Sequence, residues 1–272
     1  MPTRIRVGAV EYLNTKPLIE RLTDFHPQID LRLELPSVLA DQLASDDLDV
    51  GLIPVIEFFR ANRYRMVPNI AIGSRGPVLS VTLFSRQPWE RIRKVAMDVG
   101  SRTSAALTQV LLRKRYGITP EIVPFPMHAD PESLDTDAVL LIGDRAMRAC
   151  LPGYAYAYDL GQEWTDWTGL PFVFAVWAVR DGVDLEGVDL ALAEAKAYGL
   201  SQVGAIAQRE APGLGLDAGF CRRYLTNILH FDLGPREQAG LHHFYTLARD
   251  LELAPQGVTF ESYHPTHLVE SR

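Results

Sequence analysis

The chain has 272 residues, of which 47% are hydrophobic and 22% charged, and its formal net charge is −7. This composition is typical of a globular protein; no run of about 18 apolar residues favours a membrane span, and the negative charge argues against nucleic acid as a partner. Cys150 and Cys221 are too few for a disulfide framework or a thiolate metal site, and the N-terminal residues show no apolar signal segment. We therefore expect a cytoplasmic protein that holds any anionic ligand through local donors.

The first part of the chain alternates apolar strands with amphipathic segments. Residues 4–9 form a predicted strand, and Pro17 suits the first turn of the helix that follows. Further elements alternate in the same way, with strands over 29–35, 49–53 and 66–72 and helices beginning at Ser37 and spanning 55–64. This order predicts α/β architecture with mostly parallel sheets.

Two long β-prone runs, 78–84 and 172–179, enclose a second alternating series. That series has predicted strands ending at Met97 and spanning 121–123, 138–142 and 154–160, with a helix after Ser104; beyond it the pattern is helical over 190–208, 220–229 and 236–251. We expect lobe 1 to comprise residues 1–84 and 177–272, and an inserted lobe 2 to comprise residues 85–176. The two runs predict crossing strands that form a hinge, with a ligand cleft between the lobes.

The segment Gly100-Ser101-Arg102-Thr103-Ser104 links a short strand to a predicted amphipathic helix. Free backbone N–H groups, hydroxyl donors and the positive end of a helix dipole converge at such a helix start, which suits a carboxylate-sized anion. The alternative is that Ser101 or Thr103 only caps the helix.

Asn14 and Ser80 are two further candidates for ligand contacts. Asn14 follows the first strand, at the sheet edge where open α/β sheets bind ligands, and its alternative role is an N-cap or Asx turn before Pro17. Gly76-Pro77 predicts a turn before the run 78–84, in which Ser80 faces away from Leu79 and Val81. A hydroxyl among apolar neighbours needs a partner, which is either a ligand or nearby backbone.

Signatures of common catalytic classes are missing from the chain. It has no Walker A loop, no GxGxxG after a strand, no HExxH and no GxSxG. His128, in the loop 126–130, is either a lone acid or base or a plain loop residue. Asp144 follows the apolar run 138–142 and precedes helix-like residues, so it caps that helix or contacts a ligand or the other lobe.

Several blocks, taken in order, resemble the chorismate dehydratases of the futalosine route to menaquinone. The resemblance covers nearly the whole chain, is dense from Val7 to Trp177, and is carried by Tyr12-Leu13-Asn14-Thr15-Lys16-Pro17-Leu18, Asp49-Val50-Gly51-Leu52-Ile53-Pro54-Val55, Gly76-Pro77-Val78-Leu79-Ser80-Val81, Ser101-Arg102-Thr103-Ser104, Leu141-Ile142-Gly143-Asp144 and Leu170-Pro171-Phe172-Val173-Phe174-Ala175-Val176-Trp177.

The resemblance implies a two-lobed fold similar to type 2 periplasmic binding proteins. It also implies an enzyme that eliminates water from chorismate, a dicarboxylate, to give 3-[(1-carboxyvinyl)oxy]benzoate without a metal or organic cofactor. With the cleft, it predicts catalytic roles for two residues, Asn14 and Ser80, and substrate binding by a wider set: Pro54, Val55, Gly76, Val78, Ser101, Arg102, Thr103, Ser104, Gly143 and Asp144.

Other proteins of this fold remain as alternatives at this point. One is the enzyme of the same route that forms 1,4-dihydroxy-6-naphthoate, and another is a non-catalytic small-anion-binding protein. A transporter's solute-binding protein is expected to carry a leader segment, and a LysR-type regulator is expected to carry a helix-turn-helix before this fold. The first predicted strand of this sequence begins by residue 4, which argues against both.

Overall fold

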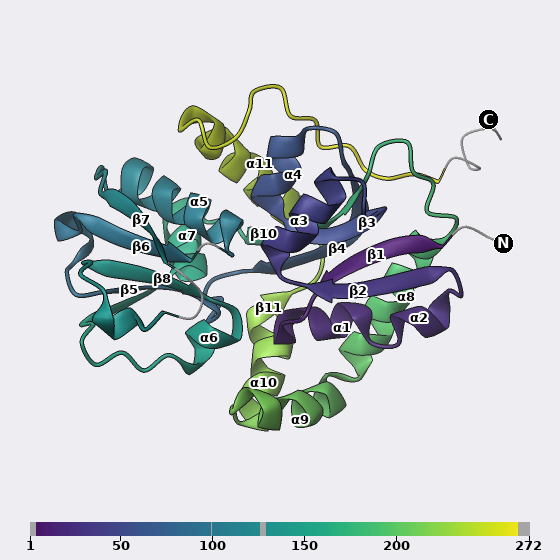
Figure 1. Ribbon diagram of the computed structural model, residues 1–272, viewed down its shortest axis with the longest axis horizontal. Coiled ribbons are helices and arrows are strands. Elements are labelled where there is room, and N and C mark those ends of the chain that lie inside the picture. The colour runs from purple at the N-terminus through teal and green to yellow at the C-terminus, as the bar shows by residue number, and fades with distance from the viewer. Residues whose placement is uncertain (1–3, 99, 126–128, 266–272) are drawn as a thin grey trace.

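Two α/β lobes lie side by side in a computed structural model that describes residues 4–98, 100–125 and 129–265 (Figure 1). Within the described residues, lobe 1 is built on a six-stranded sheet in the order β11-β4-β10-β3-β1-β2, and lobe 2 on a five-stranded sheet in the order β7-β6-β8-β5-β9. The strands of the first sheet are β1 (Ile5–Val10), β2 (Ile29–Glu34), β3 (Val50–Pro54), β4 (Arg65–Ser74), β10 (Phe172–Val179) and β11 (Leu229–His230). Those of the second are β5 (Val81–Ser85), β6 (Lys94–Asp98), β7 (Glu121–Phe125), β8 (Ala138–Ile142) and β9 (Tyr156–Asp159).

Both sheets are mixed rather than mostly parallel. Strand β1 runs parallel to β2 and β3, and β6 runs parallel to β7 and β8, as the alternation of strands and helices predicts. The first strand after each crossing reverses direction: β5 is antiparallel to β8 and β9, and β10 is antiparallel to β3 and β4.

The chain passes between the sheets in two short connections. It leaves the first sheet at Ser74 and enters the second at Val81, and it returns between Thr168 and Phe172. The expected lobe boundaries at 84/85 and 176/177 cut through β5 and β10, because a hydrophobic run does not reveal with which sheet it pairs. We propose residues 75–80 and 169–171 as the crossings, and lobe 1 and lobe 2 are used below in this sense.

The helices flank the two sheets. In lobe 1 they are α1 (Lys16–Ile19), α2 (Leu22–Phe25), α3 (Pro36–Ala44), α4 (Val55–Ala61), α8 (Val188–Ser201), α9 (Val203–Leu214), α10 (Ala218–Arg223) and α11 (Pro235–Asp250); in lobe 2 they are α5 (Arg102–Val110), α6 (Gly143–Arg148) and α7 (Leu160–Thr168). The helix expected after Pro17 is divided because Arg21 adopts a left-handed φ of 57°. The strand expected over 154–160 is present as β9, whereas helix α7, which follows it, was not expected.

Short 3₁₀ and π-helical turns complete the architecture: η1 (Leu13–Thr15), η2 (Trp89–Arg91), η3 (Leu111–Arg115), η4 (Pro131–Ser133) and η5 (Tyr224–Ile228). Segments η3 and η5 are π-helical, a form that is rare and is often found at functional sites. Segment η5 continues α10 and leads into β11, which pairs with the end of β4 beside the first crossing. The C-terminal helices thus return to the place where the lobes meet.

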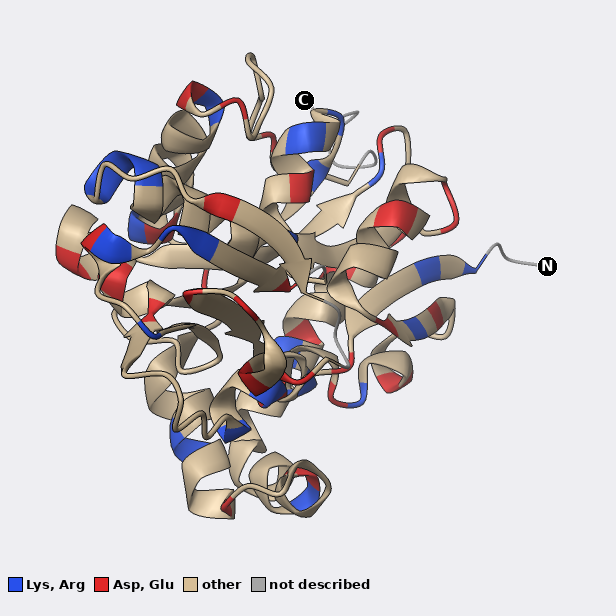
Figure 2. Cartoon of the chain, turned by 60° about the vertical axis from the view of Figure 1, so that its left-hand side comes forward, with Lys and Arg blue, Asp and Glu red and all other residues tan. Residues whose placement is uncertain are grey.

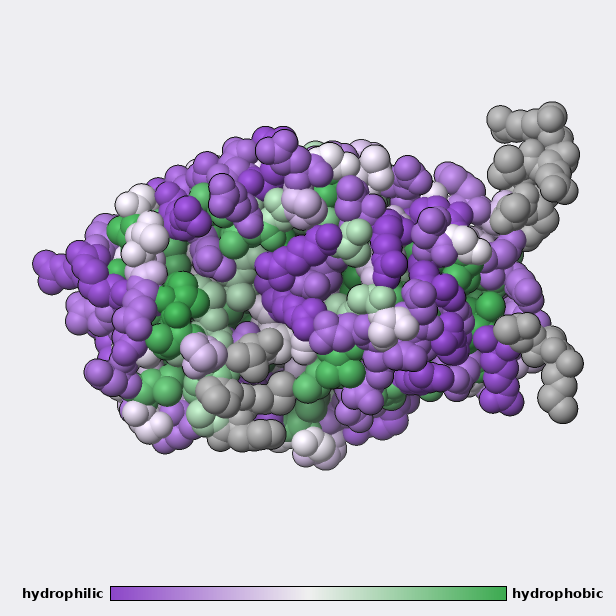
Figure 3. All heavy atoms as spheres, turned by 45° about the horizontal axis from the view of Figure 1, so that its top comes forward, coloured by the Kyte–Doolittle hydropathy of each residue, from purple (hydrophilic) through white to green (hydrophobic). Residues whose placement is uncertain are grey.

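One continuous apolar cluster extends through both lobes, from Val7 in β1 to Leu140 in β8. On the outside, Lys and Arg are interspersed with Asp and Glu (Figure 2), and on the face shown in Figure 3 hydrophilic residues predominate. Among the described residues, no helix is long and apolar enough to cross a membrane.

Candidate functional site

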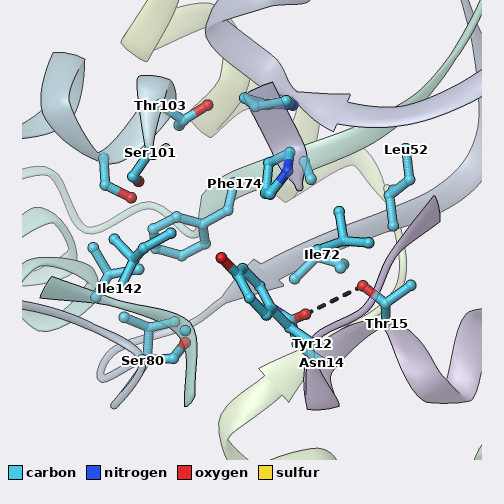
Figure 4. A pocket seen from close by; sticks show the side chains of 18 of the residues that line it. Tyr12, Asn14, Thr15, Leu52, Ile72, Ser80, Ser101, Thr103, Ile142 and Phe174 are labelled. Atoms are coloured by element: carbon cyan, nitrogen blue, oxygen red, sulfur yellow. Dashed lines mark hydrogen bonds between the residues drawn. The ribbon is translucent and has the colours of Figure 1, made fainter. Parts of the chain in front are cut away.

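A cavity with about 630 Å³ of empty space, including its mouth, lies between the two lobes. The cavity is lined by Val10, Tyr12, Asn14, Thr15, Pro36, Leu52, Pro54, Ile72, Val78, Ser80, Val81, Ser101, Arg102, Thr103, Ser104, Ile142, Gly143, Phe174, Ala175 and Leu229. Figure 4 shows how hydroxyl groups from both lobes face the space in front of Phe174.

The start of α5 forms the lobe 2 wall of the cavity. Ser101, Thr103 and Ser104 are buried, and Ser101 occupies the N-cap position without making a side-chain cap bond. The first intrahelical bond runs from Ala105 N–H to Ser101 O, which leaves the three preceding N–H groups without a helical acceptor. Capping therefore does not occupy the Ser101 hydroxyl, and the helix start presents several unused donors.

Two side chains of this helix start reach across to lobe 1. Thr103 Oγ1 accepts a hydrogen bond of 3.3 Å from the backbone N–H of Ile56, in the first turn of α4. The Arg102 guanidinium forms ion pairs with Asp41 of α3 at 2.9 Å and with Glu57 of α4 at 3.2 Å. Arg102 thus lines the cavity while its charge is paired with lobe 1 carboxylates, so it also joins the lobes.

Asn14 and Ser80 face the cavity from lobe 1 and from the first crossing. Asn14 Oδ1 accepts a 3.2 Å hydrogen bond from Thr15 Oγ1, and α1 has no side-chain cap, so Asn14 does not act as an N-cap (Figure 4). Ser80 is 2% exposed, and its Oγ accepts a 2.8 Å hydrogen bond from the Tyr224 hydroxyl. The expected alternatives, a capping asparagine and a serine bonded to nearby backbone, are both wrong for these side chains.

The loop that carries Ser80 has an unusual backbone conformation. Gly76 has a φ of 110°, and Leu79 adopts a left-handed φ of 60°, which is strained for a branched aliphatic residue. Strand β5 therefore begins at Val81 rather than at Val78, and Ser80 precedes it. The half-buried Asp159 carboxylate accepts the N–H groups of Val78 at 3.0 Å and of Leu79 at 2.7 Å and holds this conformation.

Tyr12 and Gly143 meet where the lobes approach each other. A Cβ at Gly143, whose φ is 60°, would lie 3.2 Å from the Tyr12 ring, so glycine allows the ring to pack there. The Tyr12 hydroxyl points into the cavity (Figure 4). Burial, with smaller contributions from the charges of Asp98 and Asp144, raises the pKa of Tyr12 to about 12, so the phenol remains a hydrogen-bond donor at neutral pH.

Asp144 links the lobes instead of capping a helix. Ile142 is the N-cap of α6, and the Asp144 carboxyl lies near the backbone N–H of Leu13 in lobe 1. Burial raises the pKa of this carboxyl, partly offset by the nearby Leu13 N–H and by Arg148. Of the predicted roles, helix capping is wrong and the contact with the other lobe is the one observed.

The structure brings most of the predicted site residues to one cavity but not all. Asn14, Pro54, Val78, Ser80, Gly143 and residues 101–104 line it; Val55, Gly76 and Asp144 are not among the lining residues. Sequence reasoning missed Tyr12, Thr15, Ile72 and Phe174 as lining residues, although Tyr12, Thr15 and Phe174 occur in the ordered motifs. His128 lies outside the described residues.

Fold and cavity together define a two-lobed α/β protein with a cleft between its lobes, in which hydroxyl groups of both lobes are gathered. The fold is similar to that of the periplasmic aliphatic sulphonate binding protein from Escherichia coli, with a TM-score of 0.66 and 19% identity over 98% of this chain and 94% of that chain. The predicted periplasmic-binding-protein-like fold is thus confirmed.

Comparison with the sequences of known proteins shows to which family within this fold class the chain belongs. A family described as menaquinone biosynthesis matches residues 5–250. The chorismate dehydratase of Thermus thermophilus is 31% identical over 88% of this chain and 93% of its own length, and that of Campylobacter jejuni is 25% identical over 91% and 99%. The chain therefore belongs to the menaquinone-biosynthesis family and is related along most of its length to chorismate dehydratases, which confirms the predicted membership.

Proposed function

We propose that this protein is a hydro-lyase that removes water from chorismate to give 3-[(1-carboxyvinyl)oxy]benzoate. The proposal is supported by the two chorismate dehydratase relatives and by the cavity's donors. The single observation that carries it at the level of the site is the buried, uncapped hydroxyl of Ser101, which lies with Thr103 and Ser104 at a helix start. Such donors suit a carboxylate even in a protein of net charge −7.

The two carboxylates of chorismate require two sets of donors. We assign one carboxylate to Ser101, Thr103 and Ser104, with the backbone N–H groups of the same turn. Asn14 and Ser80 lie among the other lining residues and are assigned to the second carboxylate or to the departing hydroxyl. Charge-assisted hydrogen bonds of this kind contribute roughly 1.5–3 kcal/mol each, which is sufficient to orient a small dianion.

The chemistry requires removal of a proton from C3 and of the hydroxyl from C4. The ring carboxylate is conjugated with C3 through the diene, so negative charge left by the proton spreads toward that carboxylate. Loss of the C4 hydroxyl then forms an aromatic ring, which makes the reaction strongly favourable. The protein's contribution is to orient the substrate, exclude water and stabilise the charge at the carboxylate. No electron transfer is involved, so we include no cofactor or metal in the proposal.

The base in this proposal belongs to the substrate. Among the described residues, the cavity lining includes no Asp, Glu, His or Lys side chain, and Tyr12, with a pKa of about 12, remains protonated. The enolpyruvyl carboxylate is attached through oxygen to C3, and we propose that it takes the C3 proton. The departing hydroxide then takes up this proton and leaves as water, which restores the carboxylate. Ser80 and Asn14 stabilise the departing hydroxyl and do not remove the ring proton.

The proposal is tested by incubating the protein with chorismate and following loss of its diene absorbance together with formation of the aromatic product. Separate Asn14→Ala and Ser80→Ala variants are expected to lose most turnover, whereas His128→Ala is expected to retain it. Binding of chorismate without turnover by the wild type would support the small-anion-binding alternative. Complete loss of turnover with intact binding in His128→Ala alone would refute the substrate-derived base.

The location of this reaction is also a proposal. Cys150 and Cys221 are both free thiols, and unpaired cysteines are typical of proteins in a reducing compartment. We therefore place the enzyme in the cytoplasm, with a small dicarboxylate and not a nucleic acid as its ligand. Thiol titration of protein isolated from intact cells under alkylating conditions is expected to find both cysteines unmodified by oxidation.

A further inference from the structure

Tyr224 lies directly behind the cavity and is not one of its lining residues. It begins the π-helical segment η5, is 1% exposed, and comes from the C-terminal helical region. Its hydroxyl donates the 2.8 Å hydrogen bond to Ser80 Oγ, and the Asn14 side chain lies near enough to the same phenol to lower its pKa. One buried phenol therefore lies beside both side chains that we assign to the reacting end of the substrate.

The direction of this hydrogen bond determines what Ser80 can do. A serine hydroxyl has one hydrogen to donate and two lone pairs to accept. A phenol is a stronger hydrogen-bond donor than an aliphatic hydroxyl, so we assign the hydrogen between the two oxygens to Tyr224. The hydrogen of Ser80 then remains available, and within the described residues no protein group accepts it. Ser80 lines the cavity, so its remaining hydrogen is positioned for a ligand oxygen.

Tyr224 is suited to remain a donor. Burial raises the pKa of its phenol above the ordinary value, partly offset by the hydrogen bond with Ser80 and by the nearby Asn14 side chain; the negative charges of Asp144 and Asp159 also raise it. The phenol is therefore protonated at neutral pH. It orients its neighbours rather than exchanging a proton with the substrate.

We propose that Tyr224 is a positioning residue of the dehydratase, which fixes Ser80 as a hydrogen-bond donor to the departing hydroxyl and holds the Asn14 amide beside it. This inference rests on the proposed function. It predicts that Tyr224 acts mainly through Ser80 and stabilises the transition state more than the bound substrate, because the leaving oxygen becomes more negative as its bond to C4 breaks.

The test compares Tyr224→Phe with a matched control, Tyr263→Phe. Tyr263 is also about 2% exposed, and its hydroxyl is hydrogen-bonded to Asp184 and to the N–H of Leu185, away from the residues that line the cavity. Both variants lose one buried hydroxyl, so both are expected to unfold at a lower temperature. Only Tyr224→Phe is expected to lower kcat, by about tenfold or more, with a change in KM of less than about threefold.

A double-mutant cycle shows whether Tyr224 acts through Ser80. In a Ser80→Ala background, adding Tyr224→Phe is expected to lower kcat by less than about threefold, because the group that Tyr224 orients is already gone. An equal kcat loss in the wild-type and Ser80→Ala backgrounds would overturn the inference. So would an equal kcat loss in the Tyr224→Phe and Tyr263→Phe proteins.

A crystal structure of the Tyr224→Phe protein provides a measurement that does not depend on turnover. The Ser80 hydroxyl is expected to leave its present rotamer or to gain a water at the position of the lost phenol oxygen. An unchanged rotamer without such a water would overturn the positioning role. If the wild type leaves chorismate unchanged, the proposed function fails, and this structure still decides whether Tyr224 orients Ser80.

Discussion

Replacing Asp159 by asparagine is expected to make the position of Ser80 less well fixed, although the substitution replaces no residue that lines the cavity. Asp159 Oδ1 accepts the N–H groups of Gly161 and Gln162 at 3.0 Å each and so caps α7, while Oδ2 accepts the N–H of Leu79 at 2.7 Å. Asparagine is among the best N-cap residues and can keep the first oxygen in place. Its NH₂ group then replaces Oδ2 and faces the Leu79 N–H. The cap and the bond from Val78 N–H to Oδ1 therefore survive, and the bond from Leu79 is lost.

The expected change in the free energy of unfolding of Asp159→Asn follows from two opposing contributions. A hydrogen bond from Leu79 to a charged acceptor is worth roughly 1.5–3 kcal/mol, and the left-handed Leu79 is held against a strain of about 1–3 kcal/mol. Against this, burial raises the pKa of Asp159 despite the four N–H groups that it accepts, so the native charge has a desolvation cost that asparagine avoids. We expect a net destabilisation of about 1–2 kcal/mol, or roughly 2–8 °C in Tm.

The effect on catalysis is expected to exceed the effect on stability. Once the hydrogen bond from Leu79 N–H to Asp159 is lost, Leu79 can relax from a φ of 60°, and Ser80 moves with it. Misplacement of a reacting group by about 1 Å can lower rates about 100-fold, so we expect kcat/KM for chorismate to fall by about 10–100-fold. The measurement is steady-state turnover at 25 °C, beside thermal unfolding of the same samples.

Asp217→Asn is the matched control for this substitution. Asp217 caps α10 by accepting the Phe220 N–H at 2.9 Å, and it is not among the residues that line the cavity. Its asparagine variant is expected to retain wild-type turnover. If Asp159→Asn also keeps kcat/KM within twofold of the wild type while Tm falls, the loop does not position Ser80 and the reasoning is refuted.

Three further predictions concern single residues. For Asp49, burial favours a higher pKa, but hydrogen bonds from Arg6 and Arg180 outweigh it and hold the pKa at about 2. Asp49 therefore stabilises the native state fully above its unfolded pKa of about 4. In urea unfolding, the difference in unfolding free energy between wild type and Asp49→Asn is expected to shrink from about 2 kcal/mol at pH 7 toward zero near pH 2. A difference that grows on acidification would contradict this. Arg102→Gln removes both ion pairs between α5 and lobe 1, so we expect KM for chorismate to rise up to about fivefold. The control, Arg21→Gln, removes an exposed ion pair within lobe 1 and is expected to leave KM unchanged. Equal KM values for the two variants would argue against a role for the lobe contact. Tyr12→Phe removes the hydroxyl that points into the cavity and is expected to lower kcat/KM about tenfold, and wild-type turnover by this variant would remove the phenol from the site.

The elements of lobe 1 and the helix start at Ser101 could be predicted because they follow from local patterns. Alternating apolar strands and a strand followed by hydroxyl residues are signals carried by a few neighbouring positions. Helix α7 was missed although Asp159-Leu160-Gly161-Gln162 has the spacing of a capping box, since aspartate precedes glutamine by three residues. The apolar and aromatic residues just before it favoured a strand and concealed that signal.

The support of Ser80 could not be predicted from local patterns. Leucine rarely adopts a positive φ, so nothing at Leu79 indicates the turn that ends before β5. Tyr224 is 144 residues from Ser80, and a tyrosine in an amphipathic C-terminal helix is typical of ordinary core packing. Likewise, the sheet to which β5 belongs depends on pairing with β8 and β9, which a hydrophobic run does not specify.

The two ends of the cavity differ in how firmly their hydroxyl groups are held. Within the described residues, the hydroxyls of Ser101 and Ser104 have no hydrogen-bond partner, so they can rotate to suit a carboxylate, which accepts hydrogen bonds from several directions. Ser80, in contrast, is fixed at its side chain by Tyr224 and at its backbone through Asp159. Anion binding requires only available donors, whereas elimination requires a donor aimed at one breaking bond. This difference favours placing the departing hydroxyl, rather than the second carboxylate, at Ser80.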